Sequence, residues 1–150
     1  MTINIKIQRL PGNADIPYPS KKTIGSAGMD VCAAISSSLK IEKNQIKLVP
    51  LGFRLSIPID YEAQIRPRSG LSLNHGITVL NSPGTIDSDY RGEVGVILIN
   101  LGEHSYTLKR GDRVAQLVFS KIINVNFEET QIFSDTARNE DGFGSTGSSF

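Results

Sequence analysis

The chain has 150 residues, of which 39% are hydrophobic and 21% are charged. This length indicates a single domain that can bury a core of its own, and the composition excludes a collagen-like chain or one that is disordered throughout. With 16 Lys and Arg against 15 Asp and Glu, the net charge of +1 gives no bulk electrostatic reason to expect binding to nucleic acid or to an acidic membrane.

Apolar and polar residues alternate along much of the chain. This period of two predicts strands with one face in the core and the other in water. The alternation covers residues 3–8, 51–58 and 61–66. Residues 94–99 and 114–119 are almost continuously apolar, which is typical of central strands. Turns that contain Gly or Pro separate the strands at short intervals, so we expect an all-β sandwich, jelly roll or barrel.

One short helix is expected around residues 70–74, and Arg68-Ser69-Gly70 lies where it would begin. A helix start offers free backbone N–H groups. Here a hydroxyl and a guanidinium stand beside them, which is the chemistry of a phosphate site. The alternative is a simple helix cap with a solvated arginine.

Gln116 interrupts an apolar strand, on the face that it shares with Val114 and Val118. A buried amide that lacks partners costs about 1–3 kcal/mol. Either this face is partly wet, or the amide contacts a polar ligand.

Asp87 and Asp89 lie just after the apolar Ile86. In a simple turn such carboxylates only solubilise the chain. Near bound phosphates, a carboxylate can instead activate a water or hold Mg²⁺ through water. Asn81 has donors and an acceptor that suit the edge of an amide-like base, although an ordinary turn residue ahead of Pro83 is the alternative.

The composition changes near residue 134. Residues 134–150 are rich in Ser, Gly and Thr and contain few apolar residues, so the segment cannot bury enough surface to order itself. Two interpretations follow from composition alone: a disordered tail, or an arm that orders on a ligand or on a neighbouring subunit.

Cys32 is the only cysteine, so no internal disulfide is expected, which is typical of a reducing compartment. We assign Cys32 no role beyond that of a small core residue. His75 and His104 give no recognisable zinc pattern with it.

The longest apolar run is far shorter than the roughly 20 residues of a membrane span, and the N-terminus has no long apolar segment. We therefore expect a cytoplasmic protein that contacts no membrane.

Five segments, taken in order, resemble the five motifs of the trimeric deoxyuridine triphosphatase (dUTPase) family. They read A-G-M-D at 27–30, R-P-R-S-G-L-S at 66–72, N-S-P-G-T-I-D-S-D-Y-R-G-E at 81–93, R-G-D-R-V-A-Q-L at 110–117 and R-N-E-D-G-F-G-S-T-G at 138–147. The resemblance implies an all-β jelly-roll antiparallel β-barrel of the β-clip type, with one short helix and a flexible C-terminal arm.

The resemblance also implies a homotrimer with active sites at the subunit interfaces. In the family, one chain supplies the third motif, a second chain supplies the first, second and fourth, and the third chain lays its arm over the site. On this basis residues 1–133 are expected to form the β-barrel domain. Residues 134–150 are expected to form the arm, which closes over a neighbouring subunit's active site when substrate is bound.

The implied reaction is Mg²⁺-assisted hydrolysis of dUTP to dUMP and pyrophosphate, which limits uracil in DNA and supplies dUMP for thymidylate synthesis. Asp87 would be the general base that orients water for attack on the α-phosphorus, because the family's base stands three residues before the tyrosine. Tyr90 would stack under the deoxyribose and exclude a ribose. Asn81 and the backbone near Gly84 and Gly95 would read the uracil edge.

The phosphates would be held by groups of the second and fourth motifs, namely Arg68, Ser69, Gly70 and Gln116. On the arm, Phe143 would stack on the uracil, and the phosphate contacts would come from Arg138, Gly144, Ser145 and Thr146. Mg²⁺ would be held by phosphate oxygens and water with no direct protein ligand, and Asp30 would support a metal-bound water.

Other functions stay open. A dCTP deaminase-like enzyme shares the barrel and would release ammonia from cytosine. A non-catalytic nucleotide-binding regulator would be expected to lack Asp87, Gln116 or the arm, and all of these are present. A purely structural β-sandwich leaves the polar Gln116 within an apolar strand unexplained.

Two positions depart from the family pattern: Asn139 follows Arg138 where Gly is common, and Arg66 opens the second motif where a small apolar residue is commoner.

Overall fold

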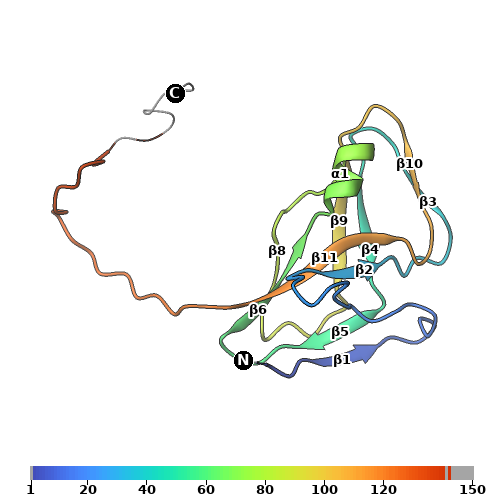
Figure 1. Cartoon of the computed structure of the whole chain (residues 1–150), viewed down its shortest axis with the longest axis horizontal. Helices are drawn as coiled ribbons and strands as arrows, with labels where there is room; N and C mark the ends of the chain where they lie inside the picture. Colours follow the sequence, from blue (N-terminus) through green and yellow to red (C-terminus); the bar gives the residue numbers. More distant parts are fainter. Residues whose placement is uncertain (1, 141, 143–150) are drawn as a thin grey trace.

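The computed structural model describes residues 2–140 and residue 142. Within this part, the chain forms eleven short strands and a single helix, α1 (Ser69–His75). The strands are β1 (Lys6–Arg9), β2 (Met29–Cys32), β3 (Leu39–Ile41), β4 (Ile46–Pro50), β5 (Phe53–Ser56), β6 (Tyr61–Arg66), β7 (Ile77–Val79), β8 (Gly84–Ile86), β9 (Gly95–Asn100), β10 (Tyr106–Leu108) and β11 (Arg113–Lys121). The structure is thus almost entirely β with one short helix, as the sequence predicts (Figure 1).

The strands pair antiparallel in four sheets. The two larger sheets have the strand orders β2-β11-β6-β8 and β4-β9-β7, while β1 pairs with β5 and β10 pairs with β3. β9 covers the first apolar run except Val94, β11 contains the second, and each strand lies between two neighbours in its sheet. The prediction that these runs form central strands is therefore confirmed.

The predicted alternation agrees with the observed burial. Leu51, Phe53, Leu55 and Ile57 are all buried, whereas Arg54 is exposed. The bounds of β6 match the predicted strand at 61–66. The N-terminal strand is shorter than predicted, because β1 pairs only with Phe53–Ser56. Beyond Ser56 the ladder would reach Pro58, which has no N–H to donate.

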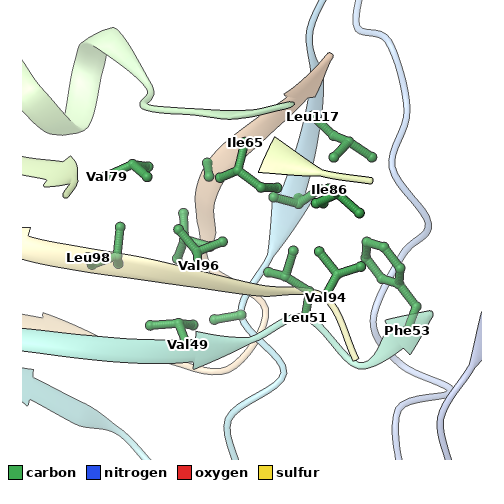
Figure 2. Close-up of a cluster of buried hydrophobic side chains, with 14 of the residues drawn as sticks. Val49, Leu51, Phe53, Ile65, Val79, Ile86, Val94, Val96, Leu98 and Leu117 are labelled. Carbon is green, nitrogen blue, oxygen red and sulfur yellow. The ribbon is translucent and has the colours of Figure 1, made fainter. Parts of the chain in front are cut away.

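The core lies between the inner faces of the sheets. Figure 2 shows side chains from both larger sheets pointing toward one another, among them Val96 and Leu98 of β9, Ile65 of β6 and Leu117 of β11. All four are at most 2% exposed. Burial of one such side chain stabilises the fold by about 1.5–3 kcal/mol, so these contacts dominate its stability.

Asn100 is the only buried polar residue among those described. Its Nδ2 donates to the Ile41 carbonyl and the His104 carbonyl, each at 2.9 Å, and its Oδ1 accepts from the Gly102 N–H at 2.9 Å. Every polar group of the amide therefore has a partner, which offsets its desolvation. Asn100 joins β9 to β3 and to the loop before β10.

The helix lies where the sequence predicts it. Its N-cap residue, Arg68, has extended backbone (φ −95°, ψ 127°) and makes no side-chain cap bond. The helix ends at Gly76, whose φ of 68° lies in the left-handed region. A Cβ at this position would lie 2.3 Å from the Gly102 nitrogen, so both the conformation and the close packing require glycine.

Among the described residues, the last strand ends at Lys121, and residues 122–140 are exposed without helix or strand. Figure 1 shows this segment running away from the barrel. The division into residues 1–133 and 134–150 remains a prediction about how the segment acts in an assembly. No helix in the described part of the chain is long and apolar enough to cross a membrane.

Candidate functional site

A cavity of about 520 Å³ opens between β8, the loop that follows it and the ends of β4 and β9. Its walls include apolar side chains from three strands, namely Leu48, Ile65 and Ile97. Five of the predicted site residues also line it: Asn81, Gly84, Asp87, Tyr90 and Gly95. The cavity thus brings together the barrel residues expected to contact the nucleoside and to act as the general base.

Strand pairing sets the position of Asp87. β8 pairs with β6 through Gly84 opposite Ile65 and through Ile86 opposite Ala63. Ile86 is buried in the core, so the next residue, Asp87, leaves the sheet at the cavity rim and is exposed. Its backbone carbonyl accepts from the Tyr90 N–H at 3.2 Å, which closes the turn that carries both side chains.

Tyr90 is held by its own loop. Its hydroxyl donates to the Glu93 carbonyl at 2.9 Å. The ring covers Gly92, where a Cβ would lie 2.3 Å from the Tyr90 hydroxyl oxygen. Glu93 in turn accepts from the Gly52 N–H through Oε1 at 3.0 Å. Glu93 was not among the predicted site residues, although it closes the third motif at 81–93.

Two glycines shape the cavity wall. A Cβ at Gly95 would lie 2.9 Å from Leu48 Cδ1, and a Cβ at Gly84 would lie 3.3 Å from Asn81 Nδ2. A side chain at either position would push a neighbour that lines the cavity. Glycine at both positions therefore keeps open the space that is expected to hold a base.

A second cluster joins the first, second and fourth motifs around Asp30. Arg68 Nε lies 3.1 Å from Asp30 Oδ1, and Arg113 Nη1 lies 3.0 Å from Oδ2. Arg68 Nη1 also donates to the Arg113 carbonyl at 2.9 Å. The Arg68 side chain is only 26% exposed and is paired with Asp30, so the interpretation of Arg68 as a solvated arginine is wrong.

Arg113 was not among the predicted site residues. The motif at 110–117 contains it, but only the pairing of β11 with β2 brings its guanidinium to Asp30. Arg113 holds Arg68 in two ways, through the shared carboxylate and through its own carbonyl. The sequence offers no signal for this contact beyond the presence of the charge.

Gln116 has a partner within the chain. It is half-buried, and its Nε2 donates to the Pro67 carbonyl at 2.9 Å. A Cβ at Gly28 would lie 2.0 Å from Gln116 Oε1, so glycine at that position makes room for the amide. The contact fixes Gln116 beside the start of α1, where Ser69 and Gly70 are exposed.

The remaining predicted residues fall outside both clusters. Arg138 lies in the exposed segment after β11. Phe143, Gly144, Ser145 and Thr146 lie outside the described residues. None of the four predicted phosphate-binding residues Arg68, Ser69, Gly70 and Gln116 lines the cavity. In the described part of the chain, the predicted site residues therefore lie in two separate clusters.

The described part of the chain contains no group of three or more His, Cys, Asp or Glu that could hold a metal ion. Asp87 and Asp30 belong to different clusters. Cys32 is buried, and burial raises the pKa of its thiol, with the nearby Asp30 charge acting in the same direction. This is the environment of the inert core residue that the sequence predicts.

A family model described as dUTPase matches residues 14–147. The deoxyuridine 5'-triphosphate nucleotidohydrolase of Thermoanaerobacter sp. (strain X514) is 48% identical over 147 residues, which cover 98% of this chain and 99% of that protein. The protein of the same name from Methylocella silvestris is 51% identical, with 97% of this chain and 92% of that protein covered.

Solved structures agree with the fold. A mutant of the Staphylococcus bacteriophage 80alpha dUTPase with dUpNHpp superposes with a TM-score of 0.86 at 23% identity, covering 98% of this chain and 100% of that one. A mutant dUTPase from the S. aureus phage phi11, described for the coordination of a structural Mg(II) ion, gives a TM-score of 0.77 at 20% identity, covering 89% of this chain and 100% of that one. The likeness confirms the jelly-roll fold. With the family model matching nearly the whole chain and relatives about half identical along its length, the chain belongs to the dUTPase family.

Proposed function

We propose that the chain catalyses the hydrolysis of dUTP to dUMP and pyrophosphate. The observation that carries this proposal is the cavity that gathers Asn81, Asp87 and Tyr90. Its volume of about 520 Å³ lies in the range of small-molecule sites, which are mostly apolar with a few well-placed polar groups. The names of the curated relatives support the same activity.

The cavity suits a pyrimidine deoxynucleoside. Leu48, Ile65 and Ile97 form apolar walls, and Asn81 brings an amide that can donate to and accept from a uracil edge. The Tyr90 ring, fixed by its bond to Glu93, offers a flat surface for the sugar. A ribose 2′-OH would meet this ring, which would select deoxyribonucleotides.

Asp87 would act as the general base. Its side chain is exposed at the cavity rim and makes no ion pair with any described residue, so its carboxylate is available to a water. The water oxygen attacks the α-phosphorus, its proton passes to Asp87, and the bond from the α-phosphorus to the bridging oxygen breaks. Pyrophosphate then leaves. A positioned base of this kind contributes about 10²–10⁴-fold to the rate.

The phosphates would be bound by Arg68, Ser69, Gly70 and Gln116. The helix has only seven residues, so binding there would depend on the Arg68 guanidinium and on backbone N–H groups rather than on a long helix dipole. Asp30 and Arg113 hold Arg68 in place. This preorganisation lowers the cost of binding a polyanion.

We further propose that complete sites form only in the homotrimer typical of the family. The two clusters are separate in one chain, so Asp87 of one subunit would face Arg68 and Gln116 of a second. The arm of the third subunit would add Arg138 and residues 143–146, with Phe143 stacking on the uracil. Closure of the arm would exclude water and complete the site.

Subunit complementation tests this division. Asp87→Asn and Arg68→Ala variants are expected to be nearly inactive alone. After co-refolding at equal amounts, about a quarter of the sites would combine an intact Asp87 from one copy with an intact Arg68 from another, by random assembly of a symmetric oligomer. Recovery of roughly that share of activity supports the shared site, whereas no recovery places both groups in one subunit.

Mg²⁺ fits this donor set. Magnesium is commonly bound through substrate phosphates, waters and one or two carboxylates rather than by an all-protein cage, and no such cage exists in the described residues. When bound, Mg²⁺ would neutralise charge on the triphosphate. The chain's contribution is to hold the phosphates, while Asp30 would contact a metal-bound water.

We also propose a cytoplasmic protein that acts on free nucleotides and not on nucleic acid.

A nucleotide panel tests the activity. Purified protein with Mg²⁺ is given dUTP, UTP, dTTP and dCTP, and pyrophosphate and ammonia are measured in parallel. Pyrophosphate from dUTP alone is expected. Ammonia from dCTP would instead assign a dCTP deaminase-like reaction, and a folded protein that is silent on all four would contradict catalysis and point to a nucleotide-binding regulator.

A further inference from the structure

A small basic groove lies on the ribbon formed by β1 and β5. It has a volume of about 200 Å³, and its lining includes Lys6, Arg54 and Arg91 together with Gln8 and Ser56. The three cationic side chains belong to exposed residues, and none forms an ion pair with a carboxylate in the described part of the chain. Three like charges around one small groove repel one another, so an anionic occupant would be favoured.

The groove adjoins the candidate site. Arg91 follows Tyr90 directly, and its Nη1 donates to the Ser88 carbonyl at 2.6 Å and to the Tyr90 carbonyl at 2.9 Å. These bonds fix Arg91 to the loop that also carries Asp87. A segment that crosses the groove therefore passes beside the cavity.

The exposed segment after β11 has the opposite charge. Residues 128–140 contain four carboxylates, Glu128, Glu129, Asp135 and Glu140, and a single cation, Arg138. Their net charge is −3, which leaves the rest of the chain at +4 because the whole chain is +1. All thirteen residues are exposed, and Figure 1 shows the segment leading away from its own barrel.

We propose that the acidic stretch 128–140 of a second copy of this chain docks in the basic groove of Lys6, Arg54 and Arg91. The proposal rests on the proposed function, in which the arm of a neighbouring subunit closes over the cavity. From Glu129 to Arg138 the chain spans at most about 30 Å when extended, so a Glu129 carboxylate held in the groove would keep Arg138 within that distance of the groove. Electrostatic attraction between the basic groove and the acidic stretch 128–140 would thus bring the arm to the site.

Zero-length carbodiimide coupling tests the contact directly, because it joins a lysine amine only to a carboxylate in ion-pair contact. Isotope-labelled and unlabelled protein are co-refolded, coupled and digested. The expected product links Lys6 to Glu128, Glu129 or Asp135, between a labelled and an unlabelled copy. Links confined to one copy, or no link from Lys6 to the arm, overturn the proposal.

Charge exchange provides the second test. Arg54→Glu is expected to raise the KM for dUTP about two- to five-fold, the size that an exposed ion pair gives. Glu129→Lys added to this variant is expected to restore the KM, which a merely structural role for Arg54 would not allow. Lys109→Glu, at an exposed lysine on the turn before β11, is the matched control and should leave the KM unchanged. If Arg54→Glu has no effect, or Glu129→Lys gives no rescue, the arm does not use the groove.

Two further measurements separate the outcomes. In about 1 M salt, where the Debye length falls to about 3 Å, the wild type and Arg54→Glu are expected to converge in KM. If inorganic phosphate alone protects Lys6 from acylation in a protein that lacks residues 128–150, and the arm does not couple to Lys6, the groove binds free anions and the proposal fails. The coupling experiment does not need turnover, so loss of the proposed activity and loss of the docking contact are seen independently.

Discussion

Replacement of Asp30 by Asn tests whether one carboxylate holds two arginines in place. Asn keeps the size of the side chain but removes the charge that Arg68 and Arg113 share. Hydrogen bonds to a charged group contribute about 1.5–3 kcal/mol against about 0.5–1.5 kcal/mol for neutral pairs, so each contact loses about 1 kcal/mol. The Arg113 side chain is 49% exposed and that of Arg68 only 26%, so solvent weakens the Arg113 contact. We expect the free energy of unfolding to fall by about 1–2 kcal/mol.

The same substitution should affect the reaction mainly through binding. A released Arg68 would hold the phosphates less well, so the KM for dUTP is expected to rise about ten-fold, which corresponds to about 1.4 kcal/mol. Urea unfolding gives the stability, and steady-state kinetics separate KM from kcat. Asp112→Asn is the matched control, because Asp112 contacts the Lys109 N–H and neither arginine. An Asp30→Asn variant with unchanged urea midpoint and KM would refute the reasoning. Arg113→Gln should raise KM in the same direction.

Three further outcomes are expected. Asp87→Asn should lower kcat by about 10²–10⁴-fold while the affinity for dUpNHpp stays within about two-fold; unchanged turnover would remove Asp87 as the base. Gly28→Ala should expel the Gln116 amide, because its Cβ would lie 2.0 Å from Oε1, and urea unfolding should show a loss of about 1–3 kcal/mol. The Arg110 guanidinium lowers the pKa of Asp15 to about 2 from its ordinary value of 3.8, so this pair stabilises the fold above pH 3.8 and ceases to do so as the pH falls through about 2. The urea midpoints of wild type and Asp15→Asn should therefore differ at neutral pH and converge near pH 2.

Much of the fold could be predicted because burial follows the period of two. The bounds of β6 and the inner places of β9 and β11 follow from apolar patterning, and α1 lies where a short helix was expected although no apolar period marks it. The three-residue strands β3 and β10 could not be predicted, since they pair only with each other and are too short to show a period. Each of these two strands forms because it pairs with the other, which is distant in sequence. The local residue pattern contains no information about such a partner.

The sequence suggests individual candidate residues for the site but not how they are arranged. Asp87, Tyr90 and Asn81 carry chemistry that their sequence context suggests, and the cavity unites them. The contact of Arg113 with Asp30 depends on the register of β11 against β2, which shifts between Arg113 and Ala115. Such a shift breaks the alternation from which faces are inferred, so the second arginine of the cluster was missed.

The net charge of the whole chain also hides how acidic and basic residues are distributed along it. The value of +1 for the whole chain gives no reason to expect a bulk attraction to polyanions, but it combines an acidic segment with a basic barrel. Charges on the two parts act over about 10 Å at 0.1 M salt, which is shorter than the reach of the segment after β11. What decides binding is therefore the charge near each surface, and Lys6, Arg54 and Arg91 line one groove without forming an ion pair to any carboxylate of the described barrel. A chain that is almost neutral as a whole can thus recognise a copy of itself by electrostatics.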